Sequence, residues 1–412
     1  MKQTEIGLIP EDWEVKRLGE IGEPCMCKRI LKEQTSPTGD IPFYKIGTFG
    51  GIPDAYISRE LFEQYKEQYN YPKKGTLLLS AAGTIGRVVV FDGKDSYFQD
   101  SNIVWIDNDE TKVTNDFLFY CYSRMQWKTE EGGIVSRLYN ANLKSTSFIA
   151  PKSLAEQQRI AKALSDVDAL ISTTEKLIQK KKNIKQGAMQ NLLTGKKRLP
   201  GFGDKQTDLF VPNGTHTKEV KDVSPEQIRL SAKMKQTELG EIPEDWEVKS
   251  LGEMLKIGHG KDYKNLKSGN VPVYGTGGYM TSVNDFLYEG ETVCIGRKGT
   301  IDKPQYHSGK IWTVDTLFYT YDFKSLNPKY LFYKFCLIDW LSMNEASGVP
   351  SLTAKNIEDI QITIPTEEEQ TAIANVLSSM DKDIETLNTK LEKYRNLKTA
   401  MMQQLLTGKI RL

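Results

Sequence analysis

The residue types best suited to catalysis are few and scattered in this chain. Three histidines occur in 412 residues, His216, His259 and His307, and no pair has the His-Glu-x-x-His spacing of a zinc hydrolase. We interpret each as a solvated surface side chain. Cys25 and Cys27 form a single Cys-x-Cys pair without the second pair that a four-ligand zinc site needs. No Gly-x-x-x-x-Gly-Lys-Ser/Thr loop is present, so the sequence argues against nucleotide hydrolysis.

Two short motifs come closer to catalytic ones but have a simpler interpretation. Residues 327–330 read Asn-Pro-Lys-Tyr, one residue away from the Asn-Pro-Pro-Tyr with which amino-methyltransferases grip a flipped adenine. No glycine-rich cofactor strand accompanies them, and a proline at the first position of a helix explains the run. Glu14-x-Lys16 and Glu247-x-Lys249 have a spacing found in nucleases. They lack a suitably placed upstream acid, so we interpret them as solvated strand residues.

Basic and amide side chains in glycine-rich or polar loops are better candidates, and their chemistry is DNA contact. Arg and Lys match guanine edges and Asn matches adenine, whereas phosphate contacts only position a protein. Any one such residue is more simply interpreted as a solvated surface residue, but the group together favours an interface. The candidates are Lys45, Lys73, Lys74, Arg87, Arg137, Asn140, Thr276, Arg297, Lys298 and Lys355.

The composition limits what kind of protein this is. Charged residues make up 26% of the chain but nearly cancel, for a net charge of +1, so a DNA reader must place its cations locally. Five cysteines in a chain of this length predict reduced thiols rather than a disulfide framework. No apolar run approaches the roughly 18–20 residues that span a bilayer. We expect a soluble, cytoplasmic protein.

The chain contains nearly the same unit twice. Met1 begins MKQTEIGLIPEDWEVKRLGEI and Met234 begins MKQTELGEIPEDWEVKSLGEM, with seventeen of twenty-one positions identical. A second matching pair, NLLTGKKRL and QLLTGKIRL, ends at Leu199 and Leu412. A protein made of two copies of one unit is suited to reading something that also comes in two parts.

Each copy has strand-like runs first, then a short helical passage, then a long helix. The strand-like runs are rich in β-branched and aromatic residues and are broken by Gly and Pro. The predicted fold class is α+β, with two globular mixed α/β domains, a long two-helix coiled coil and an internal pseudo-twofold repeat. The predicted segments are 1–151 for the first domain, 152–199 for the first helix, 200–233 for a connector, 234–365 for the second domain and 366–412 for the second helix.

The long helices are predicted from their ends and from their apolar period. Ser153 with Glu156, and Thr366 with Glu369, have capping-box spacing, and glycines follow where a helix C-cap belongs. Apolar side chains step by four and three, which is the coiled-coil period, so each helix has the other as its natural partner. The pattern leaves the parallel and antiparallel directions open. The predicted seam consists of Ile160, Leu164, Val167, Ile171, Ile178, Ile373, Leu377, Met380, Ile384, Leu387 and Leu391.

The order of these motifs resembles one known family. A duplicated Ile-Pro-Glu-Asp-Trp-Glu-Val-Lys opener, a Gly-Thr-Ile turn, a Glu-Gln-x-x-Ile-Ala helix start and a Leu-Leu-Thr-Gly-Lys helix end cover essentially the whole chain. The chain thus resembles the specificity subunit of type I restriction–modification systems. The resemblance implies two target recognition domains, each reading half of a split site on double-stranded DNA. It also implies an antiparallel coiled coil that acts as a ruler and docks partner subunits.

The same resemblance implies that the subunit is not itself an enzyme. Two methyltransferase subunits would bind S-adenosylmethionine and methylate adenine, and restriction subunits would use ATP and Mg, with no cofactor on this chain. Residues 23–150 and 256–364 match each other poorly, so the target should be asymmetric and interrupted, with half-sites about one helical turn (roughly 34–36 Å) apart. The alternatives are a self-sufficient DNA methyltransferase or nuclease, and a coiled-coil scaffold that binds proteins.

Overall fold

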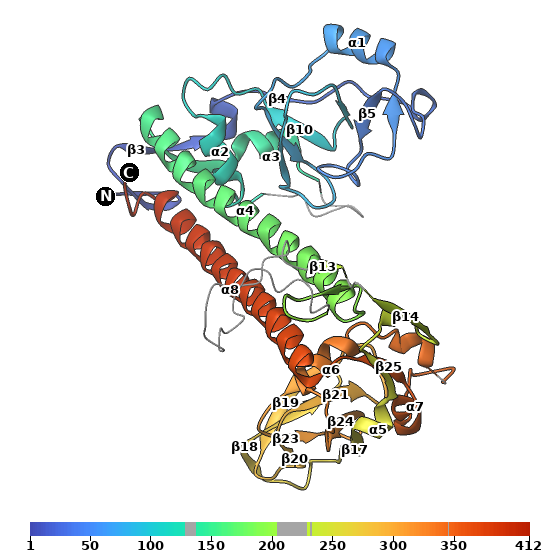
Figure 1. Cartoon of the computed structure of the whole chain (residues 1–412). Coiled ribbons are helices and arrows are strands. Elements are labelled where there is room, and N and C mark those ends of the chain that lie inside the picture. Colours follow the sequence, from blue (N-terminus) through green and yellow to red (C-terminus); the bar gives the residue numbers. More distant parts are fainter. Residues whose placement is uncertain (128–136, 204–228, 231–232, 345) are drawn as a thin grey trace, which may run out of the picture. The chain divides into compact units, whose positions relative to one another are not determined.

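The computed structural model describes all residues except 128–136, 204–228, 231–232 and 345. The chain forms two compact units: unit 1 combines residues 1–174 with 390–412, and unit 2 contains residues 175–389. Helices α4 (Leu154–Leu192) and α8 (Glu367–Leu405) each contribute residues to both units (Figure 1). The compact units therefore do not follow the predicted segments along the sequence. Each unit combines one globular domain with segments of both helices.

Unit 1 is built from small, mostly antiparallel sheets. The hairpin of β1 (Lys2–Thr4) and β2 (Gly7–Ile9) leads into β3 (Trp13–Arg17), which pairs with β11 (Ser147–Pro151) just before α4. A four-stranded sheet has the order β4-β10-β7-β8, and a three-stranded sheet has the order β6-β5-β9. The remaining elements are β4 (Pro24–Cys25), β5 (Ile41–Tyr44), β6 (Tyr56–Ile57), α1 (Arg59–Gln68), β7 (Leu77–Ser80), β8 (Val88–Val90), β9 (Tyr97–Phe98), β10 (Ile103–Ile106), α2 (Asn115–Tyr122) and α3 (Asn140–Ser145).

Unit 2 has the same opening hairpin as unit 1 and the same kind of strand pair before its long helix, and we call these repeated parts the frame. The other sheets of unit 2 differ from those of unit 1. Its hairpin β14–β15 leads into β16, which pairs with β25 just before α8. Two four-stranded sheets have the orders β17-β24-β21-β22 and β19-β18-β23-β20. The elements are β12 (Lys197–Arg198), β13 (Arg229–Leu230), β14 (Met234–Thr237), β15 (Gly240–Pro243), β16 (Glu247–Ser250), α5 (Leu251–Met254), β17 (Lys256–His259), β18 (Ser268–Gly275), β19 (Gly278–Val283), β20 (Tyr288–Glu289), β21 (Thr292–Gly296), β22 (Gln305–His307), β23 (Lys310–Thr313), β24 (Leu317–Tyr321), α6 (Pro328–Phe335), α7 (Ala354–Glu358) and β25 (Gln361–Ile364).

The long helices have 39 residues each and run antiparallel within each unit. In unit 1, Leu164 near the start of α4 shares a core with Leu405 at the end of α8. In unit 2, Leu192 at the end of α4 shares a core with Leu377 near the start of α8. The direction that periodicity left open is thus the one that the family resemblance implied. Mixed α/β domains on a pair of antiparallel helices confirm the predicted fold class.

The predicted seam is unevenly buried. Among its eleven positions the buried ones are Ile160, Leu164, Val167, Ile178, Ile373, Leu377 and Leu391, and the half-buried ones are Ile171, Met380, Ile384 and Leu387. The four–three spacing also passes through Lys185 and Lys398, which pair with Asp381 and Asp168 respectively. The seam therefore contains charged layers as well as apolar ones.

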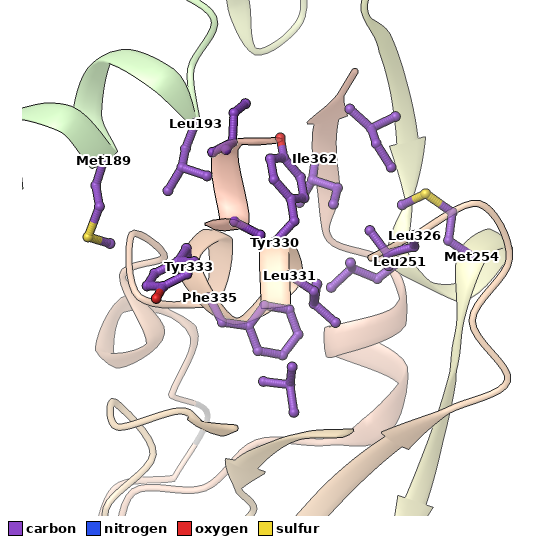
Figure 2. Packing of buried hydrophobic residues seen from close by; sticks show 14 of the residues in the cluster. Met189, Leu193, Leu251, Met254, Leu326, Tyr330, Leu331, Tyr333, Phe335 and Ile362 are labelled. Carbon is purple, nitrogen blue, oxygen red and sulfur yellow. The ribbon is translucent and has the colours of Figure 1, made fainter. Parts of the chain in front are cut away.

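The core of unit 2 joins the globular domain to both helix segments. Figure 2 shows Met189 and Leu193, from the end of α4 and the turn after it, beside Tyr330 and Tyr333 of α6. Residues of β25 and α5, among them Ile362 and Leu251, belong to the same cluster. Since apolar contact is the main source of stability, the domain and the helix ends should unfold together.

The helix starts differ in part from the predicted capping boxes. Ser153 Oγ accepts a hydrogen bond from the Glu156 N–H, and Thr366 Oγ1 accepts one from the Glu369 N–H, both at 3.4 Å. The second half of the box was wrong. The Glu156 and Glu369 carboxylates bind arginine and tryptophan side chains instead, because a guanidinium is a stronger partner for a carboxylate than a single backbone N–H.

Each long helix is followed by a glycine at a position where a side chain would be strained. Gly195 and Gly408 have φ of +71° and +67°, as expected at helix C-caps. A Cβ at Gly195 would lie 2.5 Å from Pro243 Cδ, and one at Gly408 would lie 2.5 Å from Pro10 Cγ. The helix tail of one repeat thus packs closely on the opening segment of the other repeat.

Candidate nucleic-acid interface

In unit 1, two of the predicted DNA-contacting residues lie in one groove. Lys45 follows β5, and Arg137 is brought alongside by an isolated bridge between Arg137 and Ala82. Both line a groove of about 700 Å³. The groove is also lined by Arg29, Lys32, Gln99 and Asn102, which sequence reasoning missed.

The cations of this groove are only lightly held by the protein. Arg29 Nε lies 2.9 Å from Asp100 Oδ2, and Lys45 Nζ lies 2.8 Å from Asp54 Oδ1. The Arg29 side chain is 66% exposed. The Lys45–Asp54 pair is exposed on both sides, and such pairs contribute at most about 1 kcal/mol, so a phosphate or a base edge can replace Asp54 at little cost.

Amide groups complete the groove. Arg137 Nη2 donates to Asn102 Oδ1 at 3.2 Å, and Gln99 Oε1 accepts from the Ile46 N–H at 2.9 Å. Both amides belong to the turn between β9 and β10, where Ser101 has a left-handed φ of 59°. A guanidinium beside amides provides the donors and acceptors that read guanine and adenine edges.

The other predicted residues of unit 1 lie elsewhere. Arg87 Nη1 donates to the Phe49 carbonyl at 2.7 Å, so it supports the turn after Lys45. Lys73 and Lys74 line a separate hollow of about 560 Å³. Asn140 is the first residue of α3.

In unit 2, three predicted residues meet at the turn after β21. Arg297 Nη1 donates to the Asp315 carbonyl at 3.2 Å, and Lys298 forms a bridge with Ser351. Thr276 Oγ1 lies 3.8 Å from the position that a Cβ on Gly299 would occupy. Lys355 lies on α7, 75% exposed, and pairs with Asp359, the residue that follows this helix.

The same bridge position carries its cation differently in the two units. By the alignment of the two Gly-Thr-Ile turns, Ala82 corresponds to Lys298, and the partner of Ala82 is Arg137 while the partner of Lys298 is Ser351. Each unit therefore presents one cation at this place, but from opposite sides of the bridge. The two units therefore differ in where a repeated frame places a hydrogen-bond donor.

Unit 2 also contains a groove of about 830 Å³ that was not predicted. It is lined by Lys303, Lys329 and Lys382, together with the ring pair of Tyr274 and His307. That pair stacks with centroids 3.7 Å apart. Burial lowers the pKa of His307 to about 4, so this ring is neutral at pH 7. The prediction that His307 is a solvated surface side chain was therefore wrong. His259 is exposed, and His216 lies outside the described residues.

The catalytic look-alikes have structural roles. Asn327 Oδ1 accepts hydrogen bonds from the backbone N–H groups of Lys329 and Tyr330, and Pro328 begins α6, which confirms the interpretation as a helix start. In the part of the chain that the structure describes, no three His, Cys, Asp or Glu side chains are grouped to hold a metal. Burial raises the pKa of the Cys27 thiol to about 12. Among the same residues no helix is long and apolar enough to cross a bilayer.

Comparison with known proteins places this arrangement. The family model described as "Type I restriction modification DNA specificity domain" matches residues 10–185 and 243–393. A Haemophilus influenzae protein provisionally named a type I restriction enzyme specificity subunit is 58% identical over 165 residues, which cover 40% of this chain and 43% of that protein. The type I restriction enzyme MjaVIII specificity subunit of Methanocaldococcus jannaschii is 26% identical and covers 98% of this chain and 94% of its own.

A solved structure shares the fold. The type I restriction–modification S subunit of M. genitalium superposes with a TM-score of 0.61 over 98% of both chains, at 15% sequence identity. The family match covers most of both repeats. It includes both residues of the Ala82–Arg137 bridge and both residues of the Lys298–Ser351 bridge. The chain therefore belongs to the family of type I restriction–modification DNA specificity subunits, and its function is the recognition of DNA sequence.

Proposed function

We propose that this specificity subunit reads an asymmetric target of two unlike half-sites separated by unread base pairs, with one half-site for each unit. One observation carries the proposal: a repeated frame holds two surfaces that differ in their sheets and in the placement of their cations. In unit 1 the surface is formed around the β6-β5-β9 sheet, and in unit 2 around the β18–β19 hairpin and the turn after β21. Different surfaces select different bases, whereas two equal ones would select a palindrome.

The charge distribution supports this proposal. The net charge is +1, so the chain as a whole has little attraction for DNA, yet Arg29, Lys32, Lys45 and Arg137 line one groove. Local cations of this kind provide phosphate contacts and guanine contacts together. Retention on DNA should consequently weaken as salt rises.

The chemistry is assigned to partner subunits. We infer that the chain is not catalytic, that two methyltransferase subunits bind it and carry S-adenosylmethionine, and that restriction subunits supply the ATP- and Mg-dependent steps. The names of the relatives support this division, since each is a specificity subunit of a type I restriction enzyme. The structural role of Asn327, which caps helix α6, agrees with it.

The test is selection from random duplexes. The subunit would be purified with its methyltransferase partner and used to enrich DNA from a randomised pool. We expect two unlike short motifs at one fixed spacing. Enrichment of a palindrome, or of nothing, would contradict the proposal. Methyl transfer from labelled cofactor by this chain alone would favour a self-sufficient methyltransferase instead.

A further inference from the structure

A cluster of three polar side chains ties the globular domain of unit 1 to both long helices. Tyr120 of α2 donates its hydroxyl proton to Asp168 Oδ2 at 2.9 Å. Asp168 lies on α4, and its other oxygen lies 2.6 Å from Lys398 Nζ of α8. The ammonium group also lies 5.7 Å from the centre of the Tyr120 ring. Three elements from distant parts of the chain thus meet through a single carboxylate.

Unit 2 contains the same cluster. Tyr333 of α6 donates to Asp381 Oδ2 of α8 at 2.8 Å, and Lys185 Nζ of α4 pairs with Asp381 Oδ1. The Lys185 ammonium lies 5.2 Å from the centre of the Tyr333 ring. All three residue types recur at one offset, since 333 − 120, 381 − 168 and 398 − 185 each equal 213.

In both clusters the lysine comes from the other repeat. Lys398 belongs to the second repeat and serves the first domain, whereas Lys185 belongs to the first repeat and serves the second domain. The side chains are partly buried, with Lys398 29% and Asp168 34% exposed, and Lys185 20% and Asp381 42% exposed. At this depth a hydrogen bond to a charged group contributes more than a fully exposed ion pair.

The clusters add direction to contacts that otherwise have little. Helix α2 packs on the long helices through Phe117, Leu118 and other apolar side chains, and apolar contact tolerates small rotations. A hydrogen bond weakens steeply when its angle departs from linear. The tyrosine hydroxyl therefore fixes the angle at which each globular domain sits on its helix pair.

DNA makes that angle matter. Adding one base pair between two half-sites moves the second by about 3.4 Å and turns it by roughly 34–36° about the helix axis. A rigid holder rejects such a change, and a loosened one accepts it at lower cost. The stiffness with which each domain is held would therefore limit the spacer lengths that a bipartite reader accepts.

We propose that Tyr120–Asp168–Lys398 and Tyr333–Asp381–Lys185 are positioning triads that set the spacer length this subunit accepts. The residues act through the domains they orient and contact no base. This inference rests on the bipartite target proposed above.

The experiment uses the full chain in complex with its methyltransferase partner. Dissociation constants are measured on duplexes with the selected half-sites and with spacers of the native length, one base pair shorter and one longer. The variants are Tyr120→Phe, Tyr333→Phe and the double variant, which keep the ring and remove only the hydroxyl. We expect the wild type to lose at least tenfold in affinity on either wrong spacer, and the double variant to lose at most threefold. The penalty for a mismatch inside a half-site should not change.

Two controls separate positioning from general support. Asp166→Asn removes an exposed ion pair with Lys162 that lies within α4 alone. Asp383→Asn removes an exposed pair with Lys181 that joins the two long helices to each other. Both variants should keep the wild-type ratio between the dissociation constants on the wrong and the native spacer. Asp168→Asn should bring this ratio closer to one, as is expected for Tyr120→Phe.

The outcomes are distinct. A narrowed spacer ratio with intact half-site discrimination supports the triads as positioning residues. Equal loss on all spacers would overturn the proposal and leave a purely structural role, and so would the same narrowing in Asp383→Asn. A wild-type complex without any spacer preference would overturn the bipartite target itself.

Discussion

Arg198, at the end of the first repeat, forms a bidentate ion pair with Asp245 in the opening segment of the second repeat. The two N–O distances are 2.7 and 2.9 Å. The same guanidinium binds the buried carboxylate of Glu369, which also accepts a hydrogen bond from Trp246 Nε1 at 3.2 Å. Arginine, two carboxylates and tryptophan thus fasten the first helix tail onto the second domain.

The end of the second repeat makes the same kind of contact with the opening segment of the first repeat. Arg411 binds Asp12 through both terminal nitrogens, at 2.9 and 2.6 Å, and also binds Glu156. Trp13 Nε1 donates to Glu156 at 3.4 Å. Each unit is therefore completed by the tail of the other repeat, and neither repeat contains a whole unit by itself.

Replacing Arg198 should destabilise the protein strongly. Glu369 is fully buried, and burial raises the pKa of its carboxyl group, so the arginine compensates a charge that the interior disfavours. Arg198→Met leaves that carboxylate without a counter-ion and should cost about 3–5 kcal/mol in the free energy of unfolding, measured in urea. Arg411→Met should cost less, because the Arg411 side chain is 43% exposed. The exposed Lys196 supplies the control, since Lys196→Met should change stability by no more than about 0.5 kcal/mol. Equal effects of Arg198→Met and Lys196→Met would refute the role of this contact.

Lys334 should make stability depend on pH. Its ammonium group is buried and donates to the Leu193 carbonyl and to Thr363 Oγ1, both at 2.9 Å, and burial lowers its pKa to about 7. The unfolded chain keeps this proton up to about pH 10.4, whereas the folded chain loses it above about 7. Folding releases a proton in that window, so stability should rise with pH there by about 1.4 kcal/mol per unit and stay flat below it.

The variant Lys334→Met isolates this contribution. Urea unfolding between pH 6 and 9 should show a rising free energy of unfolding for the wild type. The free energy of unfolding of the wild type minus that of the variant should therefore increase with pH above 7. A difference that is constant across the range would show that Lys334 does not titrate in it.

The local features of the fold were predictable and the long-range ones were not. Repetition and the four–three spacing predicted two long helices, and Gly195 and Gly408 marked their ends, because these patterns reflect contacts a few residues apart. Glu156 was predicted to cap its own helix, which is what an isolated helix would favour. Arg411, 255 residues away, takes that carboxylate instead, and no local pattern reveals such a partner.

The candidate interface was predictable only in residue type. Lys45 and Arg137 are separated by more than ninety positions, and they share a groove because an isolated bridge at Ala82 brings Arg137 back to the sheet. Arg29 was missed for the same reason, since its pairing with Asp100 depends on the turn between β9 and β10. His307 was misjudged because its burial arises from stacking on Tyr274 in another sheet.

Aspartate in the helix seam should disrupt folding, and aspartate on the outer face should not. Leu164 and Leu377 are fully buried, and Leu164→Asp or Leu377→Asp places a charge without a partner in the core, at a cost of several kcal/mol. Leu170 and Leu397, on the same two helices, are 44% and 46% exposed and receive the same substitution as controls. Thermal unfolding followed by circular dichroism should show a large loss for the buried pair and little change for the exposed pair. Similar melting of all four variants would contradict the assigned seam.

Base reading should divide cleanly between the two units. Arg137 is placed beside Asn102 in unit 1, and Lys298 occupies the corresponding bridge in unit 2. Arg137→Ala should relax discrimination at one position of one half-site, with a loss of about 1–3 kcal/mol on the preferred sequence, and leave the other half-site unchanged. Lys298→Ala should do the converse. Lys73→Ala, in a separate hollow, should weaken binding equally on all sequences if it contacts phosphate at all. Binding to a panel of single-mismatch duplexes in both half-sites, at two salt concentrations, distinguishes these outcomes. Relaxation of both half-sites by either single variant would mean that the two units do not read separately, because a cation confined to one unit cannot discriminate bases contacted by the other unit.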